Sequence, residues 1–333
     1  MDSDNKGLFA KIGTAIVGIY LLITIGLGIY WSDEPAVWDV ARTVEQDAGA
    51  LGKQPKVGFA TTSTLIRLGE QLLDKPGGYL TNDIAPPGIW LDNMPNWEYG
   101  VLVQVRDMTR ALRKDIARSQ STSREDVDLS TAEPQLHFDN NSFWFPSTES
   151  EYRRGLDYLR AYQVRLLDDD VTNAQFYARA DNLRNWLADV ETRLGSLSQK
   201  LSASVGKEQI NIDLAGDSAA SQSTNAPKEL MVKTPYLQID DIFYEARGAS
   251  YALIHLLKAI EIDFKDVLEK KNAMVSMRQI VRELEASQQP VHSPMILNGS
   301  GFGLFANHSL VMANYISRAN AAIIDLRRLL EQG

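Results

Sequence analysis

The chain has 333 residues and is 44% apolar, enough to bury a sizeable core, so disorder along its whole length is excluded. Lys and Arg number 34 against 43 Asp and Glu, and this acidic balance argues against nucleic acid as a partner. Because the chain contains no cysteine, disulfides, thiolate metal sites and cysteine nucleophiles are excluded.

Residues 12–31, "IGTAIVGIYLLITIGLGIYW", carry no charge and would span about 30 Å as a helix, the thickness of a hydrocarbon core. The run is longer than the ~7–15 residues of a signal-peptide core, and no A-x-A cleavage pattern follows it. We therefore predict an uncleaved transmembrane helix, with the lipid bilayer as its partner. Small residues recur along it at multiples of four and could favour a homo-oligomer, namely Ala10, Thr14, Gly18 and Gly26.

The charges that flank this helix predict its orientation. Lys6 and Lys11 precede it, while Asp33, Glu34 and Asp39 follow it. Since basic residues stay on the cytoplasmic side, residues 1–11 are predicted to be a cytoplasmic tail. The bulk of the chain would then be periplasmic, in a single-pass protein of a Gram-negative inner membrane.

Beyond residue 34, apolar residues recur at helical spacing and predict helices near 61–73, 97–116 and 148–166. The clearest pattern runs from Phe176 to Leu201 in steps of four and three, a heptad seam, with Thr172 and Gln175 at capping-box spacing before it. Whether the neighbour along this seam is intramolecular or a second subunit is left open by the pattern. Residues 206–229 are small and polar, and predict a flexible linker or long loop between a first helical half, 34–205, and a second, 230–333.

In the second half, Asp240 and Asp241 could cap a helix over 242–260, and further helices are expected near 277–284 and 304–331. "NGSGFG", residues 298–303, matches no nucleotide-binding spacing and is interpreted as a turn that enters the last helix. The predicted fold class is all-α: a transmembrane helix followed by a multi-helix bundle with long irregular connecting loops.

The irregular stretch 77–100, "GGYLTNDIAPPGIWLDNMPNWEYG", combines aromatic rings, carboxylates and a Pro-Pro-Gly corner. We interpret it as a flap packed over the bundle, with a partner-binding surface and an active site as alternatives. If the stretch is a flap, Trp90→Ala should lower the stability of the protein by roughly 3–5 kcal/mol, whereas Glu98→Gln should change it little. The candidate flap or interaction residues are Tyr79, Asp83, Trp90, Asp92, Asn93, Trp97 and Glu98.

No catalytic, cofactor-binding or metal-binding residue is predicted. The four histidines form no metal-binding pattern, and each is best explained as a structural histidine. The acidic run 168–170 lacks the alternating donors of a calcium loop and better fits the start of a helix.

Three stretches resemble a bacterial family of single-pass membrane proteins of unknown function: "PPGIWLDNMPNWEYGVLVQVRD", "YEARGASYALIHLLKAIE" and "SPMILNGSGFGLFANHSLVMANYISRANAA". The resemblance covers nearly the whole chain and implies an inner-membrane protein of Gram-negative bacteria. That family has no established activity, so it assigns no functional residue.

The leading hypothesis is a non-enzymatic, membrane-anchored periplasmic scaffold that contacts other envelope proteins. One alternative is an envelope enzyme or glycan-binding module that uses the loop 77–100, where Glu98, Asp92 and Asp83 lie among aromatic residues. A second is a cytoplasm-facing membrane adaptor with the reverse topology.

Overall fold

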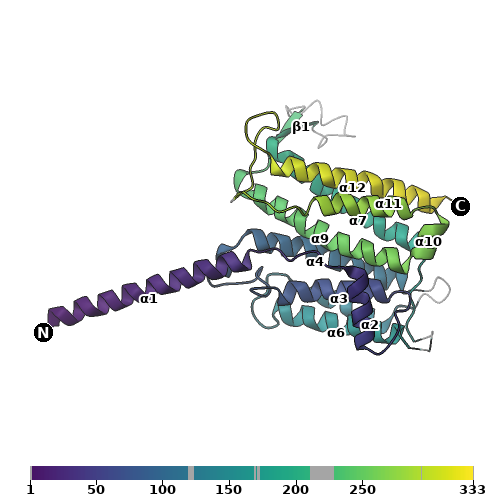
Figure 1. Ribbon diagram of the computed structural model, residues 1–333, viewed down its shortest axis with the longest axis horizontal. Coiled ribbons are helices and arrows are strands. Elements are labelled where there is room, and N and C mark those ends of the chain that lie inside the picture. The colour runs from purple at the N-terminus through teal and green to yellow at the C-terminus, as the bar shows by residue number, and fades with distance from the viewer. Residues whose placement is uncertain are drawn as a thin grey trace, which may run out of the picture.

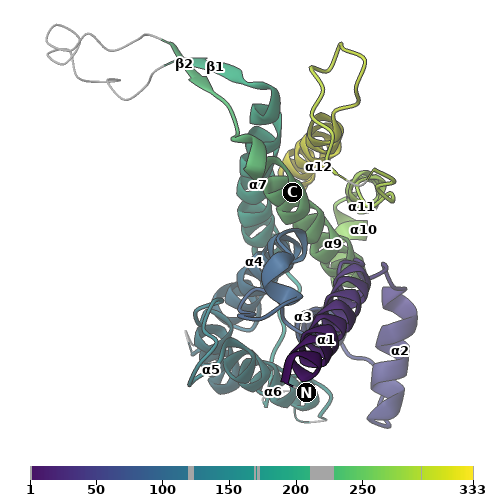
Figure 2. The same ribbon diagram turned by 90° about the vertical axis from the view of Figure 1, so that its left-hand side faces the viewer.

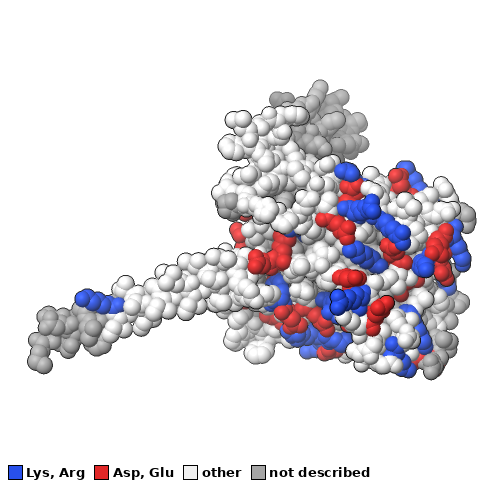
Figure 3. Space-filling model, viewed as in Figure 1, with Lys and Arg blue, Asp and Glu red and all other residues white. Residues whose placement is uncertain are grey.

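The computed structural model describes residues 2–118, 124–168, 170, 173–210, 229–293 and 295–332, and consists of one projecting helix and a helical body (Figure 1). The projecting helix, α1, comprises Asp2–Trp31. From Lys11 to Trp31 it is long and apolar enough to cross a membrane, and nearly all of that stretch is exposed. Figure 3 shows charged side chains over the body and almost none along this helix.

Five helices and their connections follow α1 along the chain. They are α2 (Val40–Ala50), α3 (Phe59–Asp74), α4 (Asn93–Ala111), α5 (Val127–Leu136) and α6 (Thr148–Leu166). A short 3-10 turn, Gly88–Trp90, precedes α4, and a π-helical turn, Leu112–Ile116, ends it. The helices predicted near 61–73, 97–116 and 148–166 are thus confirmed.

The later helices in the described part of the chain are α7 (Ala180–Ser202), α9 (Ile239–Asp263), α10 (Lys265–Lys270), α11 (Met274–Ala286) and α12 (His308–Glu331). Short 3-10 turns cover Ala203–Val205 and Tyr236–Gln238. Strands β1 (Lys207–Ile210) and β2 (Glu229–Val232) form an antiparallel hairpin at the two ends of the predicted linker. Residues 211–228 lie outside the described part of the chain, so the linker stays a prediction, whereas the all-α fold class is confirmed.

Among the described helices, α4 and α9 make the most extensive contact, and two glycines bring their backbones together. A Cβ built on Gly100 would lie 2.1 Å from the Glu245 carbonyl oxygen, and one built on Gly248 would lie 2.0 Å from that of Trp97. Neither position has room for a side chain. Buried side chains from α3 through α12 belong to one continuous core, so the predicted halves are packed together; their status as separate domains remains a prediction.

The heptad seam of α7 faces the interior of the same chain. Its apolar residues from Leu183 to Leu201 are buried, and α7 lies along α12 while also touching α4 and α9 (Figure 2). The neighbour left open by the sequence pattern is therefore intramolecular.

Three expected helix starts are wrong. α7 begins at Ala180 after an Arg179 that makes no side-chain cap, so Phe176 precedes the helix, and Thr172 lies outside the described residues. α9 follows Gln238, and Asp240 and Asp241 occupy its first turn instead of the cap. α12 begins at His308 because the Asn307 side chain caps it by accepting the Leu310 N–H at 2.8 Å.

Candidate functional site

The loop between α3 and α4, residues 75–92, is fixed to the body by a buried ion pair. Lys75 Nζ contacts the Glu98 carboxylate, and both side chains are completely buried. The same carboxylate accepts the backbone N–H groups of Leu80 and Thr81, each at 2.9 Å, and the Thr81 hydroxyl. The loop backbone is thereby held in place by a residue of α4, which supports the flap interpretation of this stretch.

Glu98 is unsuited to be an enzymatic acid here. Burial raises the pKa of its carboxyl, while Lys75, the Thr81 hydroxyl and the Leu80 N–H act in the opposite direction. Both of its oxygens already accept bonds from the chain, and the residue has no exposed surface. An acid must approach the proton acceptor of a substrate, so this geometry favours a positioning role.

The other candidate residues divide between interior and surface. Trp97 and Tyr79 are buried, as a flap requires. Asp92 caps α4 by accepting the N–H of Asn93, its first residue, at 2.9 Å. Asp83 lies against Gly88, where a built Cβ would be 1.9 Å from its Oδ2, and burial raises the pKa of Asp83.

Trp90 corrects the sequence-based interpretation. Its side chain is 55% exposed, so it is not the buried ring that closes the flap. Trp90→Ala would therefore empty no enclosed site, and the loss of roughly 3–5 kcal/mol expected for a buried aromatic ring does not apply. Tyr79 has that buried position instead.

A second loop, residues 137–147 between α5 and α6, is attached to the first. The Tyr79 hydroxyl donates to the Asn140 carbonyl at 3.1 Å. The Asn82 amide donates to the Ser142 carbonyl at 2.9 Å and to Glu149 at 3.0 Å. Sequence reasoning missed this loop, although three consecutive aromatic residues before a proline, 143–145, were a readable signal.

The segment that follows α1 is clamped to α9 by an ion pair. Arg247, which is 6% exposed, donates to both carboxylate oxygens of Glu34 at 2.6 to 2.9 Å. Its other terminal nitrogen donates to the carbonyls of Ser287 and Gln289, at 3.1 and 2.9 Å. The bidentate ion pair and the two hydrogen bonds to backbone carbonyls hold Arg247 and Glu34 in one relative orientation. The direction in which α1 leaves the body is therefore fixed.

His255 forms a second clamp on the same segment. Its Nε2 accepts the Trp38 N–H at 3.1 Å, its Nδ1 lies 2.7 Å from the Tyr251 carbonyl, and its ring stacks on Trp38 with centroids 3.6 Å apart. Burial lowers the pKa of His255 to about 3, so the ring is neutral with its proton on Nδ1. His255 is thus a structural histidine, as expected from the sequence.

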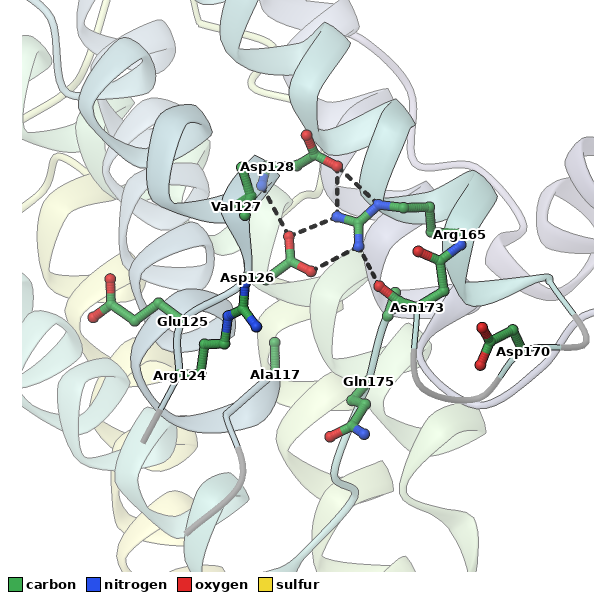
Figure 4. Close-up of a pocket in the computed structure, with 11 residues that line it drawn as sticks. Ala117, Arg124, Glu125, Asp126, Val127, Asp128, Arg165, Asp170, Asn173 and Gln175 are labelled. Carbon is green, nitrogen blue, oxygen red and sulfur yellow. Dashed lines mark hydrogen bonds and ion pairs between the residues drawn. The ribbon is translucent and has the colours of Figure 1, made fainter. Parts of the chain in front are cut away.

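A hollow of about 700 Å³ is lined by the start of α5, by Arg165 near the end of α6 and by residues 124–126 and 173–175. Figure 4 shows Arg165 pointing toward Asp126 and Asp128. The guanidinium donates to Asp126 at 2.7 and 3.0 Å and to Asp128 at 2.9 Å. Asp126 also caps α5. The two carboxylates outnumber this one cation, so the cluster ties two helices together and offers little attraction to an anionic ligand.

The remaining sequence motifs, the candidate metal ligands and the loop 298–303, form no reactive or ligand-binding site among the described residues. Among the described residues no group of three His, Asp or Glu side chains could hold a metal ion. Within 298–303, Gly299 donates to the Ala306 carbonyl at 3.0 Å, which closes a loop before α12. Phe302, Leu304 and Phe305 project from this loop with exposures of 105%, 101% and 73%.

Comparison with known proteins places the whole chain in one family. Residues 3–333 match the family model described as "Uncharacterized protein conserved in bacteria (DUF2333)". Neither the curated proteins nor the solved structures give a match. The resemblance to a bacterial family of unknown function is confirmed.

Proposed function

We propose, for a chain that belongs to the DUF2333 family of uncharacterized bacterial proteins, a role as a membrane-anchored helical scaffold of the cell envelope. The observation that carries the proposal is the rigid joint after α1. An apolar helix of spanning length leaves the body through a segment clamped by Arg247 and His255. The last turns of α1 also lie against the body, with Trp31 at Gly77 and Gly28 at Pro87, and a removable leader needs no such contacts.

In this proposal the body lies in the periplasm and contacts other envelope proteins without catalysing a reaction. Flanking charge supports the orientation, with Lys6 and Lys11 before the span and Asp33 after it. The uncovered apolar loop that carries Phe302, Leu304 and Phe305 is the proposed contact surface.

Topology is tested with reporters fused after the C-terminus. We expect an alkaline phosphatase fusion to be active and a fluorescent protein that folds only in the cytoplasm to be dark. Changing Lys6 and Lys11 to Glu should reduce phosphatase activity, because the orientation signal is weakened. The reverse reporter pattern would support the cytoplasm-facing adaptor.

The scaffold role is tested by photo-crosslinking in living cells. A photoreactive residue at Phe305 should crosslink to one or a few envelope proteins, while the same residue at Asp325, a 70% exposed side chain on α12, should not. Equal crosslinking from both positions, or none from Phe305, would contradict a partner at this loop.

A further inference from the structure

Two loops at one end of the body expose large apolar side chains side by side. The loop 75–92 carries Ile84, Ile89 and Trp90, which are 62%, 58% and 55% exposed. The loop 137–147 carries Phe143, Trp144 and Phe145, which are 45%, 70% and 89% exposed. Side chains of this size are normally covered when they gather in one place, so this surface fits an apolar partner.

Both loops lie where α1 joins the body. A Cβ built on Gly77 would lie 2.8 Å from the Trp31 ring, and one built on Gly28 would lie 3.5 Å from Pro87 Cβ, so the first loop touches the last turns of α1. The second loop is joined to the first through Asn82 and Ser142. Figure 1 shows α1 leaving this end of the body, and Figure 2 views the body from that side.

The chemistry of these loops selects lipid as the partner. Where a spanning helix leaves a bilayer, Trp and other aromatic side chains concentrate at the headgroup level. Apart from the buried Lys75, neither loop contains Lys or Arg, so attraction to anionic headgroups contributes nothing. Insertion would depend on apolar burial alone.

We propose that these two loops insert their apolar side chains into the interfacial layer of the same bilayer that α1 crosses. The proposal rests on α1 as a membrane anchor. Together with α1, the loops give the body three contacts with one membrane face. The body is then held against the bilayer at a fixed tilt instead of moving freely on a tether.

The test uses the full-length protein in phosphatidylcholine vesicles. Because the chain has no cysteine, single cysteines can be introduced at Phe145 and Ile89 and labelled with an environment-sensitive dye. Lipids with a nitroxide near the headgroup should quench both dyes several-fold more than a dye at Asp325, on the opposite part of the body. Quenching should be unchanged between low and high salt, since no cation is involved.

A dye at Leu22, a 72% exposed residue in the middle of α1, separates the two proposals. It should be quenched by a nitroxide near the bilayer centre. If Leu22 is quenched while Phe145 and Ile89 behave like Asp325, loop insertion is wrong and the anchor stands; if Leu22 is not quenched, the anchor itself fails. A blue-shifted, unquenched dye at Phe145 would indicate coverage by protein, such as a second copy, and would overturn the lipid assignment.

Discussion

At the scale of single residues, the buried pair of Lys75 and Glu98 shows how a charged residue can be a structural element. Both side chains are fully enclosed, and the carboxylate orders the backbone at Leu80 and Thr81. Removing one member of a buried ion pair leaves the other charge buried and unpaired. Burying an unpaired charge costs more free energy than burying the intact pair. Glu98, in the first turns of α4, therefore contributes more to stability than is usual for an acidic residue beside an irregular loop.

Glu98→Gln is expected to destabilise the protein by about 3–5 kcal/mol, because Lys75 keeps a buried charge without a counter-charge. This reverses the small effect expected from the sequence. Urea unfolding of the full-length protein in detergent, followed by circular dichroism, measures the change. The double variant Lys75→Met with Glu98→Gln should recover part of the loss, and a single Glu98→Gln with wild-type stability would show that the pair is not buried.

His255 gives a pH dependence with a definite sign. Its pKa is lowered to about 3, whereas the unfolded side chain titrates near ~6.5. Below pH ~6.5 the unfolded state binds the proton more readily than the folded state. The free energy of unfolding therefore keeps the full contribution of His255 above that pH and falls as the pH drops toward 3, by up to about 1.4 kcal/mol per pH unit. Asp263, whose pKa burial raises to about 6, acts in the opposite sense between about 6 and 4.

His255→Gln should therefore lower stability at neutral pH and flatten its decline between pH ~6.5 and ~4.5. Unfolding free energies measured across this range test the expectation. Asp263→Asn is the matched control, since it should make the decline steeper. Parallel profiles for the wild type and His255→Gln would mean that the ring does not titrate as described.

At the scale of elements, α7 shows that a heptad seam can serve a compact body. Leu187 and Leu194 are completely buried, and α7 lies along α12 of the same chain. Glycines act at the same scale between α4 and α9, where contact of backbones leaves no room for a Cβ at Gly100 or Gly248. The helical body is thus stabilised mainly by packing between pairs of helices, and less by the connecting loops.

Leu194→Asp is expected to cost several kcal/mol, because it places a charge in an apolar interior. Thr192→Asp, at an exposed position on the same helix, should change stability by less than about 0.5 kcal/mol. Urea unfolding compares them. Unchanged stability of Leu194→Asp together with loss of a crosslinked oligomer would place the seam between subunits.

At the scale of the whole molecule, the joint after α1 fixes the direction in which this apolar helix leaves the body. Glu34 and Trp38 each contact α9, more than two hundred residues away along the chain. Two contacts of this kind on a segment of eight residues, 32–39, leave it little freedom. The direction of α1 is therefore a property of the folded body.

Arg247→Met should broaden the distance distribution between spin labels at Ile16 on α1 and Val275 on α11, because the clamp on Glu34 is lost. Both positions are exposed, at 62% and 80%. Pulsed electron paramagnetic resonance in lipid nanodiscs measures the distribution. Arg278→Met, which removes a more exposed pair with Glu261, is the control and should leave it narrow; an unchanged distribution in Arg247→Met would contradict a rigid joint.

The sequence by itself determined the all-α class, the apolar helix and most helix positions. The spacing of apolar residues and the length of an apolar run are local properties of the chain that do not depend on how the helices pack. It also predicted that the aromatic rings of the stretch 77–100 are buried, which holds for Tyr79 and Trp97 but not for Trp90. It could not identify the partners of Glu98 and Arg247, or α12 as the neighbour along the seam of α7, because these depend on contacts between distant segments.

Only the tertiary structure decided that Trp90 is exposed while Tyr79 is enclosed. Both are aromatic residues in one loop, and nothing in their local pattern distinguishes them. The difference arises because Glu98 and Asn82 fix the loop so that Tyr79 points toward Asn140 and Tyr152, whereas Trp90 remains on the surface. Burial is settled by which elements meet, and that is a property of the assembled fold.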